Sequence, residues 1–248
     1  MTHVVIVGGG PGGYEAALVA SQLGGRVTLI DTDGLGGSAV LTDCVPSKTL
    51  IATAEVMTEV REAAELGLRF GAGDSAHVDA VVSIDLAAVN KRVLDLARKQ
   101  SEDICERIQR ENVELVIGRG RLEGPDRVVA ETADGERSFD ADMVLIATGA
   151  TPRTLATAQP DGERILTWTQ LYNLTELPER LIVVGSGVTG AEFASAYDAL
   201  GCDVVLISSR DRVLPGEDAD AAQVLEDVFA RRGLTVLQKS REIGRAHV

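Results

Sequence analysis

The sequence predicts an α/β fold that contains two copies of one β-α-β unit. Two segments look alike, HVVIVGGGPGGYEAALVASQLGGRVTLID at residues 3–31 and RLIVVGSGVTGAEFASAYDALGCDVVLIS at residues 180–208. Each has a short apolar strand, the pattern G-x-G-x-x-G, an alanine-rich helix and a second apolar strand. The same order of elements occurring twice indicates an internal duplication.

The segment between the two copies has the spacing of amphipathic helices. TLIATAEVMTEVREAAEL (49–66) and LAAVNKRVLDLARKQSEDICERIQREN (86–112) place apolar residues three and four apart, with charged residues between them. We therefore expect a helical insertion over about residues 49–110.

Short apolar runs separated by turn residues follow the helices and predict strands. They are VELVIG (113–118), RVVAE (127–131) and the start of DMVLIATGATPR (142–153). Residues 150–179 then hold three of the prolines and connect the two copies. We expect a first domain over residues 1–149 and a second over residues 150–248.

The composition excludes some classes of partner and site. The formal net charge of −14 repels a phosphate backbone, so we expect no nucleic-acid partner. No apolar run approaches membrane-spanning length, and the first residues lack the basic start of a secretory signal. The three cysteines lie far apart, which predicts neither disulfides nor a metal site, and a reducing cytoplasm is the expected location.

The first glycine loop has the features of a dinucleotide site. Gly8 suits the tight turn, Gly10 lets the backbone approach a pyrophosphate, and Gly13 lets helix and strand pack closely. The helix that follows directs N–H groups and its dipole at the phosphates. Asp31 ends the second strand, where a carboxylate accepts hydrogen bonds from ribose hydroxyls. The competing interpretation is a purely structural glycine turn.

The second loop repeats the glycines of the first, but the position that corresponds to Asp31 is not acidic. Ser208 stands where an NAD-selecting acid is expected, and Arg210 and Arg212 follow it. A serine does not repel a 2′-phosphate and an arginine can pair with one, which favours NADPH or the use of both cofactors. The alternative is that both arginines are merely solvated. The glycines of this loop are Gly185, Gly187 and Gly190.

Taken together, these motifs resemble the flavoprotein disulfide reductases, a family that includes dihydrolipoyl dehydrogenase, glutathione reductase and mercuric reductase. The resemblance rests on the glycine-rich start, the stretch GGSAVLTDCVPSK (36–48), ATG before the linker and a second G-x-G-x-x-G-x-E. It implies FAD on the first unit and NAD(P)H on the second. It also implies further cofactor-binding positions at Gly12, Gly37, Ser38, Lys48, Thr148 and Gly149.

The sequence departs from the family pattern at the first redox cysteine. The family reads G-G-T-C-x-x-x-x-C-x-P-S-K, whereas here Ala39 takes the place of the first cysteine and Cys44 retains the second. A dithiol relay needs two sulfurs, so no redox disulfide can form at this place. Cys44 is either a residue beside the flavin or a small buried residue at a helix start.

A lysine and a glutamate of the family are retained. The resemblance places Lys48 near the reactive edge of the isoalloxazine and pairs it with Glu192, which follows the second glycine loop. The two residues would link the domains at the flavin. An ordinary solvated lysine is the alternative.

A flavin with no disulfide must pass its electrons directly to a small oxidant, and quinones are the natural acceptors. The stretch around Cys44 is similar to the actinobacterial NAD(P)H:quinone reductase subgroup, which implies an FAD-dependent NAD(P)H:quinone oxidoreductase with Lys48, Glu192 and Cys44 at its catalytic site. Two alternatives remain, a dihydrolipoyl dehydrogenase and a non-catalytic nucleotide-binding fragment.

Compared with the family that it resembles, the sequence has the length of an N-terminal half. Family members are much longer than the 248 residues here, so we expect the second nucleotide domain to be incomplete and the C-terminal dimerisation domain to be absent. The full-length form is expected to be a homodimer.

Overall fold

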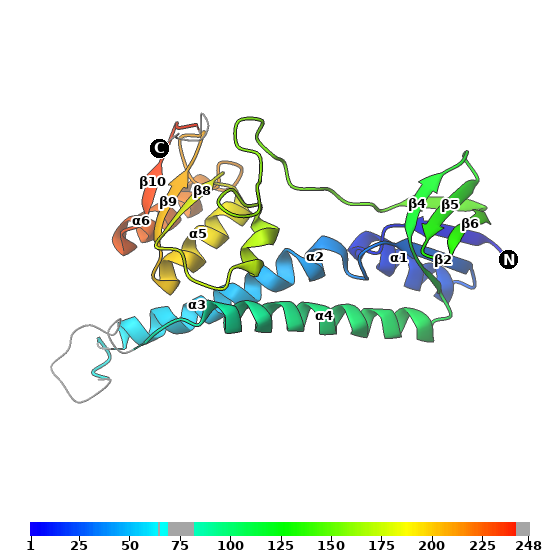
Figure 1. Ribbon diagram of the computed structural model, residues 1–248, viewed down its shortest axis with the longest axis horizontal. Helices are drawn as coiled ribbons and strands as arrows, with labels where there is room; N and C mark the ends of the chain where they lie inside the picture. Colours follow the sequence, from blue (N-terminus) through cyan, green and yellow to red (C-terminus); the bar gives the residue numbers. More distant parts are fainter. Residues whose placement is uncertain (64, 69–81, 242–248) are drawn as a thin grey trace. The chain divides into compact units, whose positions relative to one another are not determined.

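The computed structural model describes residues 1–63, 65–68 and 82–241, and Figure 1 shows its strands and helices. The first part contains β1 (His3–Val7), α1 (Pro11–Gln22), β2 (Arg26–Asp31), α2 (Gly37–Leu41), α3 (Cys44–Glu62), α4 (Leu86–Arg110), β3 (Glu114–Ile117), β4 (Arg119–Leu122), β5 (Arg127–Thr132), β6 (Gly135–Asp140) and β7 (Met143–Ile146). The second contains the 3₁₀ helix η2 (Trp168–Asn173), β8 (Arg180–Val184), α5 (Val188–Leu200), β9 (Asp203–Ile207), α6 (Ala219–Arg232) and β10 (Thr235–Leu237).

The chain divides into two compact units. The first unit comprises Met1–Pro46 and Leu94–Pro152, and the second comprises Ser47–Val93 and Arg153–Val248. The division therefore falls inside α3 and α4, as well as close to the connection expected near residue 150. The assignment of residues 1–149 to FAD and 150–248 to NAD(P) stays a prediction.

The first unit contains a four-stranded parallel sheet in the order β3-β2-β1-β7. The central strand β1 pairs with β2 on one side and with β7 on the other. Strands buried on both faces are expected to be almost continuously apolar, as VVIV and VTLI are. This arrangement confirms the first predicted β-α-β unit and brings the carboxyl ends of β1, β2 and β7 to one edge.

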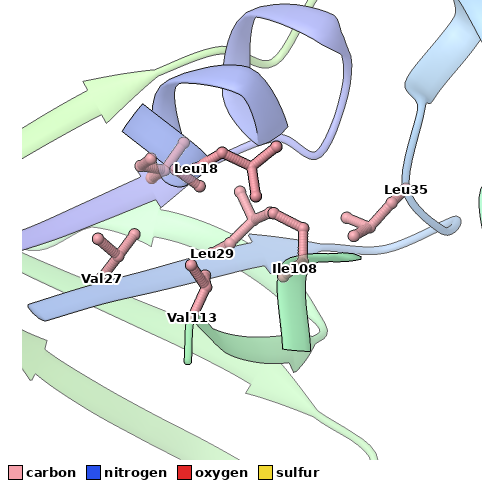
Figure 2. Close-up of a cluster of buried hydrophobic side chains, with 8 residues drawn as sticks. Leu18, Val27, Leu29, Leu35, Ile108 and Val113 are labelled. Atoms are coloured by element: carbon pink, nitrogen blue, oxygen red, sulfur yellow. The ribbon is translucent and has the colours of Figure 1, made fainter. Parts of the chain in front are cut away.

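The core of the first unit lies between this sheet and its helices. Figure 2 shows Leu18 of α1, Leu29 of β2 and Ile108 of α4 converging, and all three are almost completely buried. Deleting one such side chain costs about 2–5 kcal/mol of unfolding free energy, because the cavity does not fully collapse. The packing holds α1 against the sheet, so the glycine loop before α1 is fixed at the sheet edge.

A separate antiparallel sheet in the order β4-β5-β6 was not predicted in full. The apolar run of β5 was expected, but β4 (RGRL) and β6 (GERSFD) are rich in charged residues. In β6 only Phe139 is buried. A strand is recognised in a sequence by several buried apolar residues at alternate positions, and β6 has one.

A polar network joins β1, β2 and β3 to the end of β6. The His3 ring bonds the Asp140 carbonyl at 2.7 Å and the Thr28 hydroxyl at 2.9 Å, and that hydroxyl donates to Glu114. Burial raises the pKa of Glu114, but hydrogen bonds from Arg137 and Thr28 and nearby arginine charges outweigh it, so the pKa lies below its usual value. His3 thus has a structural role at the edge opposite the glycine loop.

The second unit repeats the same half-sheet. Strands β10, β9 and β8 are parallel, and α5 connects β8 to β9 and packs on both (Figure 1). The second predicted β-α-β unit is therefore confirmed. Helices are also confirmed within residues 49–110, as α3 and α4, but α3 ends at Glu62 and residues 63, 65–68 and 82–85 are not helical. Residues 64 and 69–81 lie outside the described residues.

Candidate functional site

A groove of about 780 Å³ opens at the carboxyl edge of the first sheet. In open α/β sheets ligands bind at this edge, where the direction of the chain connections changes. Backbone of the β1–α1 loop, the start of α2 and the end of β7 forms most of its wall. The predicted cofactor-binding residues that line it are Gly8, Gly10, Gly12, Asp31, Gly37, Ser38, Thr148 and Gly149.

Two glycines of the first loop are required by close backbone contacts. Gly8 has a positive φ of 108°, and a Cβ there would collide with the carbonyl of Ala147 after β7. A Cβ at Gly13 would collide with the carbonyl oxygen of Gly8, so α1 and β1 approach closely only with glycine here. Both residues therefore shape the loop, as the motif predicts.

Gly10 differs because it faces open space. It is the N-cap of α1 with a φ of −69°, and the nearest atom to a Cβ there would be the Gly37 Cα at 3.8 Å. Gly37, at the start of α2, has a φ of 54° and would not tolerate a Cβ, which would come 2.7 Å from the Gly10 Cα. The β1–α1 and β2–α2 loops of the first unit thus approach each other at Gly10 and Gly37, and the open position at Gly10 borders the groove.

Asp31 organises the loop from the end of β2. Its Oδ2 accepts a hydrogen bond from the Gly9 N–H at 2.6 Å. Its Oδ1 accepts the N–H groups of Asp33 and Gly34, both at 2.9 Å. The carboxylate therefore holds the β1–α1 loop and the β2–α2 loop together, in addition to lining the groove where ribose binding is proposed.

The groove also has residues that sequence reasoning missed. Gly118, Arg119 and Gly120, at the turn from β3 into β4, line it, as does Thr151. A Cβ at Gly120 would come 2.7 Å from Val7, so this turn packs directly on β1. The available signal was the G-x-G spacing in GRG after a predicted strand. Arg119 adds a positive charge to the wall.

The second glycine loop has the geometry of the first. Gly185 has a φ of 114° and donates its N–H to the Ile207 carbonyl, as Gly8 does to Ile30. A Cβ at Gly190 would collide with the Gly185 carbonyl oxygen, and one at Gly187 would meet nothing within 4 Å. The loop before α5 therefore leaves open space beside the Gly187 backbone, where a ligand can approach.

Ser208 lies inside the protein at the end of β9. It is 0% exposed, and its hydroxyl bonds that of Ser186 at 2.7 Å. It also accepts the Arg210 N–H and donates to the Arg212 carbonyl. Ser186 and Ser208 occupy the positions that Gly9 and Asp31 have in the first unit, and the bond between their hydroxyls corresponds to the bond from the Gly9 N–H to Asp31. Ser208 thereby shapes the end of the strand.

The two arginines after Ser208 differ in their surroundings. The Arg212 guanidinium donates to the carbonyls of Pro215 and Glu217, both at 3.3 Å. Arg210 has an exposed side chain. Arg210 is therefore better placed than Arg212 to receive a phosphate from solution.

Lys48 and Glu192 form an ion pair within the second unit. The Lys48 ammonium donates to Glu192 Oε1 at 2.5 Å, and the side chains are 59% and 20% exposed respectively. Lys48 lies on α3 and Glu192 on the second turn of α5. The structure thus brings together the pair that the resemblance predicted, 144 residues apart in sequence.

Cys44 is exposed and is the first residue of α3. Lys48 follows one helical turn later on the same helix. Ala39 lies in the short helix α2, where it can supply no sulfur. The burial expected under one interpretation of Cys44 is therefore wrong, because the helix begins at the surface.

The other two cysteines have no features of a redox partner. Cys202 is 4% exposed, and burial, with a smaller effect of Asp203, raises its pKa to about 11. Its thiol is therefore protonated at neutral pH and a poor nucleophile. Cys105 lies near the carboxyl end of α4 and packs against the core of the first unit.

Comparisons with known proteins agree with this geometry. The sequence profile described as pyridine nucleotide-disulphide oxidoreductase matches residues 2–242. A protein of Mycobacterium tuberculosis named NAD(P)H dehydrogenase (quinone) is 51% identical over 97% of this chain. A dihydrolipoyl dehydrogenase of Zymomonas mobilis is 33% identical over 96% of it. The chain spans 50% and 49% of the lengths of these two relatives.

Solved structures support the same relationship. The crystal structure of LpdA from Mycobacterium tuberculosis superposes with a TM-score of 0.88 at 50% identity, covering 98% of this chain and 52% of that one. Within the described residues, each helix is too short or too polar to cross a membrane. The chain therefore belongs to the pyridine nucleotide-disulphide oxidoreductase family, whose members use FAD and NAD(P)H.

Proposed function

We propose that the protein is an FAD-dependent NAD(P)H:quinone oxidoreductase. The groove of the first unit fits the ADP half of FAD, because the space beside Gly10 and Gly12 is open and Asp31 lines the same wall. Gly37, Ser38, Thr148 and Gly149 would hold the rest of the cofactor. When bound, the flavin accepts a hydride from NAD(P)H and passes two electrons to an acceptor.

The second glycine loop would bind NAD(P)H. Gly185 and Gly190 fix the turn, and the open position at Gly187 admits the pyrophosphate. Arg210 would contact the 2′-phosphate of NADPH, while the buried Ser208 holds the strand end without adding a negative charge.

The observation that carries the choice of acceptor is Ala39 in the place of a redox cysteine. With Cys44 as the remaining sulfur of this stretch, a dithiol relay to a disulfide substrate cannot operate there. A quinone needs no such relay, since it takes two electrons and two protons to become a hydroquinone. The 51% identity to a protein named NAD(P)H dehydrogenase (quinone) supports this choice.

The test of the function is turnover by the purified holoprotein and its Cys44→Ser variant. We expect NAD(P)H-dependent reduction of a soluble benzoquinone by both, with the variant within about threefold, because Cys44 is not an obligatory relay. Lipoamide should not be reduced by either protein. If quinone reduction by the variant falls to the uncatalysed rate while the variant retains FAD, Cys44 carries the electrons. Turnover of lipoamide would favour a dihydrolipoyl dehydrogenase.

The choice of nucleotide is tested at Arg210. Arg210→Ala should weaken NADPH binding by about fivefold, the effect of a largely exposed charge pair, and leave NADH binding within about twofold. Dissociation constants from fluorescence titration measure both. Arg231→Ala, which removes an exposed arginine from the end of α6, is the control. An equal loss of both nucleotides would show that Arg210 does not read the phosphate.

A cytoplasmic location and a homodimer of the longer protein complete the proposal. Both remain predictions from the sequence and from the family resemblance.

A further inference from the structure

A buried serine contacts the Lys48–Glu192 pair. Ser47 is 1% exposed, and its hydroxyl donates to Glu192 Oε2 at 3.0 Å. The Lys48 ammonium donates to the other oxygen, Oε1, and also approaches the Ser47 hydroxyl at 3.4 Å. Two consecutive residues of α3 therefore hold both oxygens of one carboxylate on α5.

The three side chains differ in how firmly the protein holds them. Lys48 has a long side chain that is 59% exposed, so packing alone does not fix its ammonium. Glu192 is 20% exposed, and its carboxylate can still rotate about its last bond. Ser47 is enclosed, and its short side chain donates to Oε2, which favours the orientation of the carboxylate that presents Oε1 to Lys48.

We propose that Ser47 is a positioning residue that fixes the Lys48 ammonium through Glu192. The proposal rests on the proposed function and on the role that the family resemblance implies for Lys48, namely a position near the reactive edge of the bound flavin. Without the Ser47 hydroxyl, Glu192 Oε2 loses a donor and the carboxylate turns toward other partners, so the ammonium spends less time in its place. The helix and its packing need not change, because serine and alanine differ by one atom.

The experiment measures the redox midpoint potential of the bound flavin and its rate of reduction by NAD(P)H. We expect Ser47→Ala to make the potential more negative and to slow reduction by about tenfold, the lower end of the effect of losing one hydrogen bond to a charged group, with KM for NAD(P)H within about twofold. Ser47→Thr, which keeps the hydroxyl, should restore both. Thr53→Val is the matched control, because its hydroxyl donates to the Thr49 carbonyl of the same helix.

An unchanged potential and rate in Ser47→Ala would overturn the proposal, as would a loss that Ser47→Thr and Thr53→Val share. If Ser47→Ala does not fold, Glu192→Asp tests the same arrangement, since the shorter carboxylate cannot reach both donors and should shift the potential in the same direction. The potential is measured without any quinone. Failure of quinone turnover would therefore reject the proposed function while leaving this result intact.

Discussion

Replacing Gly10 with valine is expected to give a folded, colourless protein. A Cβ at this position would meet only the Gly37 Cα at 3.8 Å, so the chain itself has room for a Cβ. The valine methyl groups would instead occupy the groove where the FAD pyrophosphate must approach the backbone. Overpacking of this kind costs up to about 3 kcal/mol, which corresponds to a loss of roughly 100-fold in FAD affinity. The flavin absorbance of the purified variant and its affinity for added FAD measure the effect.

The duplicated unit provides the control. Gly187 has the same place in the second loop, and a Cβ there would meet nothing within 4 Å. Gly187→Val should therefore keep its FAD and its yellow colour but bind NAD(P)H more weakly. Circular dichroism should show both variants folded. Full flavin occupancy in a folded Gly10→Val protein would mean that the first loop does not bind FAD.

The contrast with Gly13 explains why the motif was informative in the sequence. A side chain at Gly13 would collide with the Gly8 carbonyl, and one at Gly190 would collide with that of Gly185. Each contact lies within one β-α turn, so the local spacing of the glycines encodes it. The sequence shows this spacing twice, once in each unit. The alternation of apolar strands with the helices was predictable for the same reason.

Other parts of the fold depend on contacts that spacing does not encode. The charged strands β4 and β6 bury few side chains, so they lack the alternation that marks a strand. The contact of Ser208 with the cofactor stays a prediction, but its complete burial and its hydrogen bond to Ser186 across the strand end were not predicted. No property of an isolated serine predicts such a partner.

The residues around Lys48 show the same limit. The pairing of Lys48 with Glu192 joins two helices that are far apart in sequence, and only the family resemblance indicated it. The contact from Ser47 was missed altogether, because a serine near the start of a helix is usually a cap or a solvated residue. Here the helix begins at Cys44, and Ser47 lies within its first turn, facing Glu192.

Replacing Lys48 with alanine is expected to slow flavin reduction by NAD(P)H by on the order of 100-fold, the usual effect of removing a fixed group that stabilises charge developing in the reaction. The substitution removes the positive charge proposed to act on the reduced flavin, and it leaves the Glu192 carboxylate with Ser47 as its donor. An unpaired negative charge in that place opposes the reaction further. Stopped-flow absorbance of the flavin measures the rate directly, without a quinone.

Two variants separate the charge of Lys48 from general effects of substitution. Lys99→Ala removes an exposed lysine from α4 and should react at the wild-type rate. Glu192→Gln keeps the size of its side chain and the Lys48 charge but weakens the pair, so its rate should lie between wild type and Lys48→Ala. A Lys48→Ala protein that retains FAD and reacts within twofold of wild type would show that Lys48 is an ordinary surface lysine. In that case the pair with Glu192 joins α3 to α5 and has no part in the chemistry.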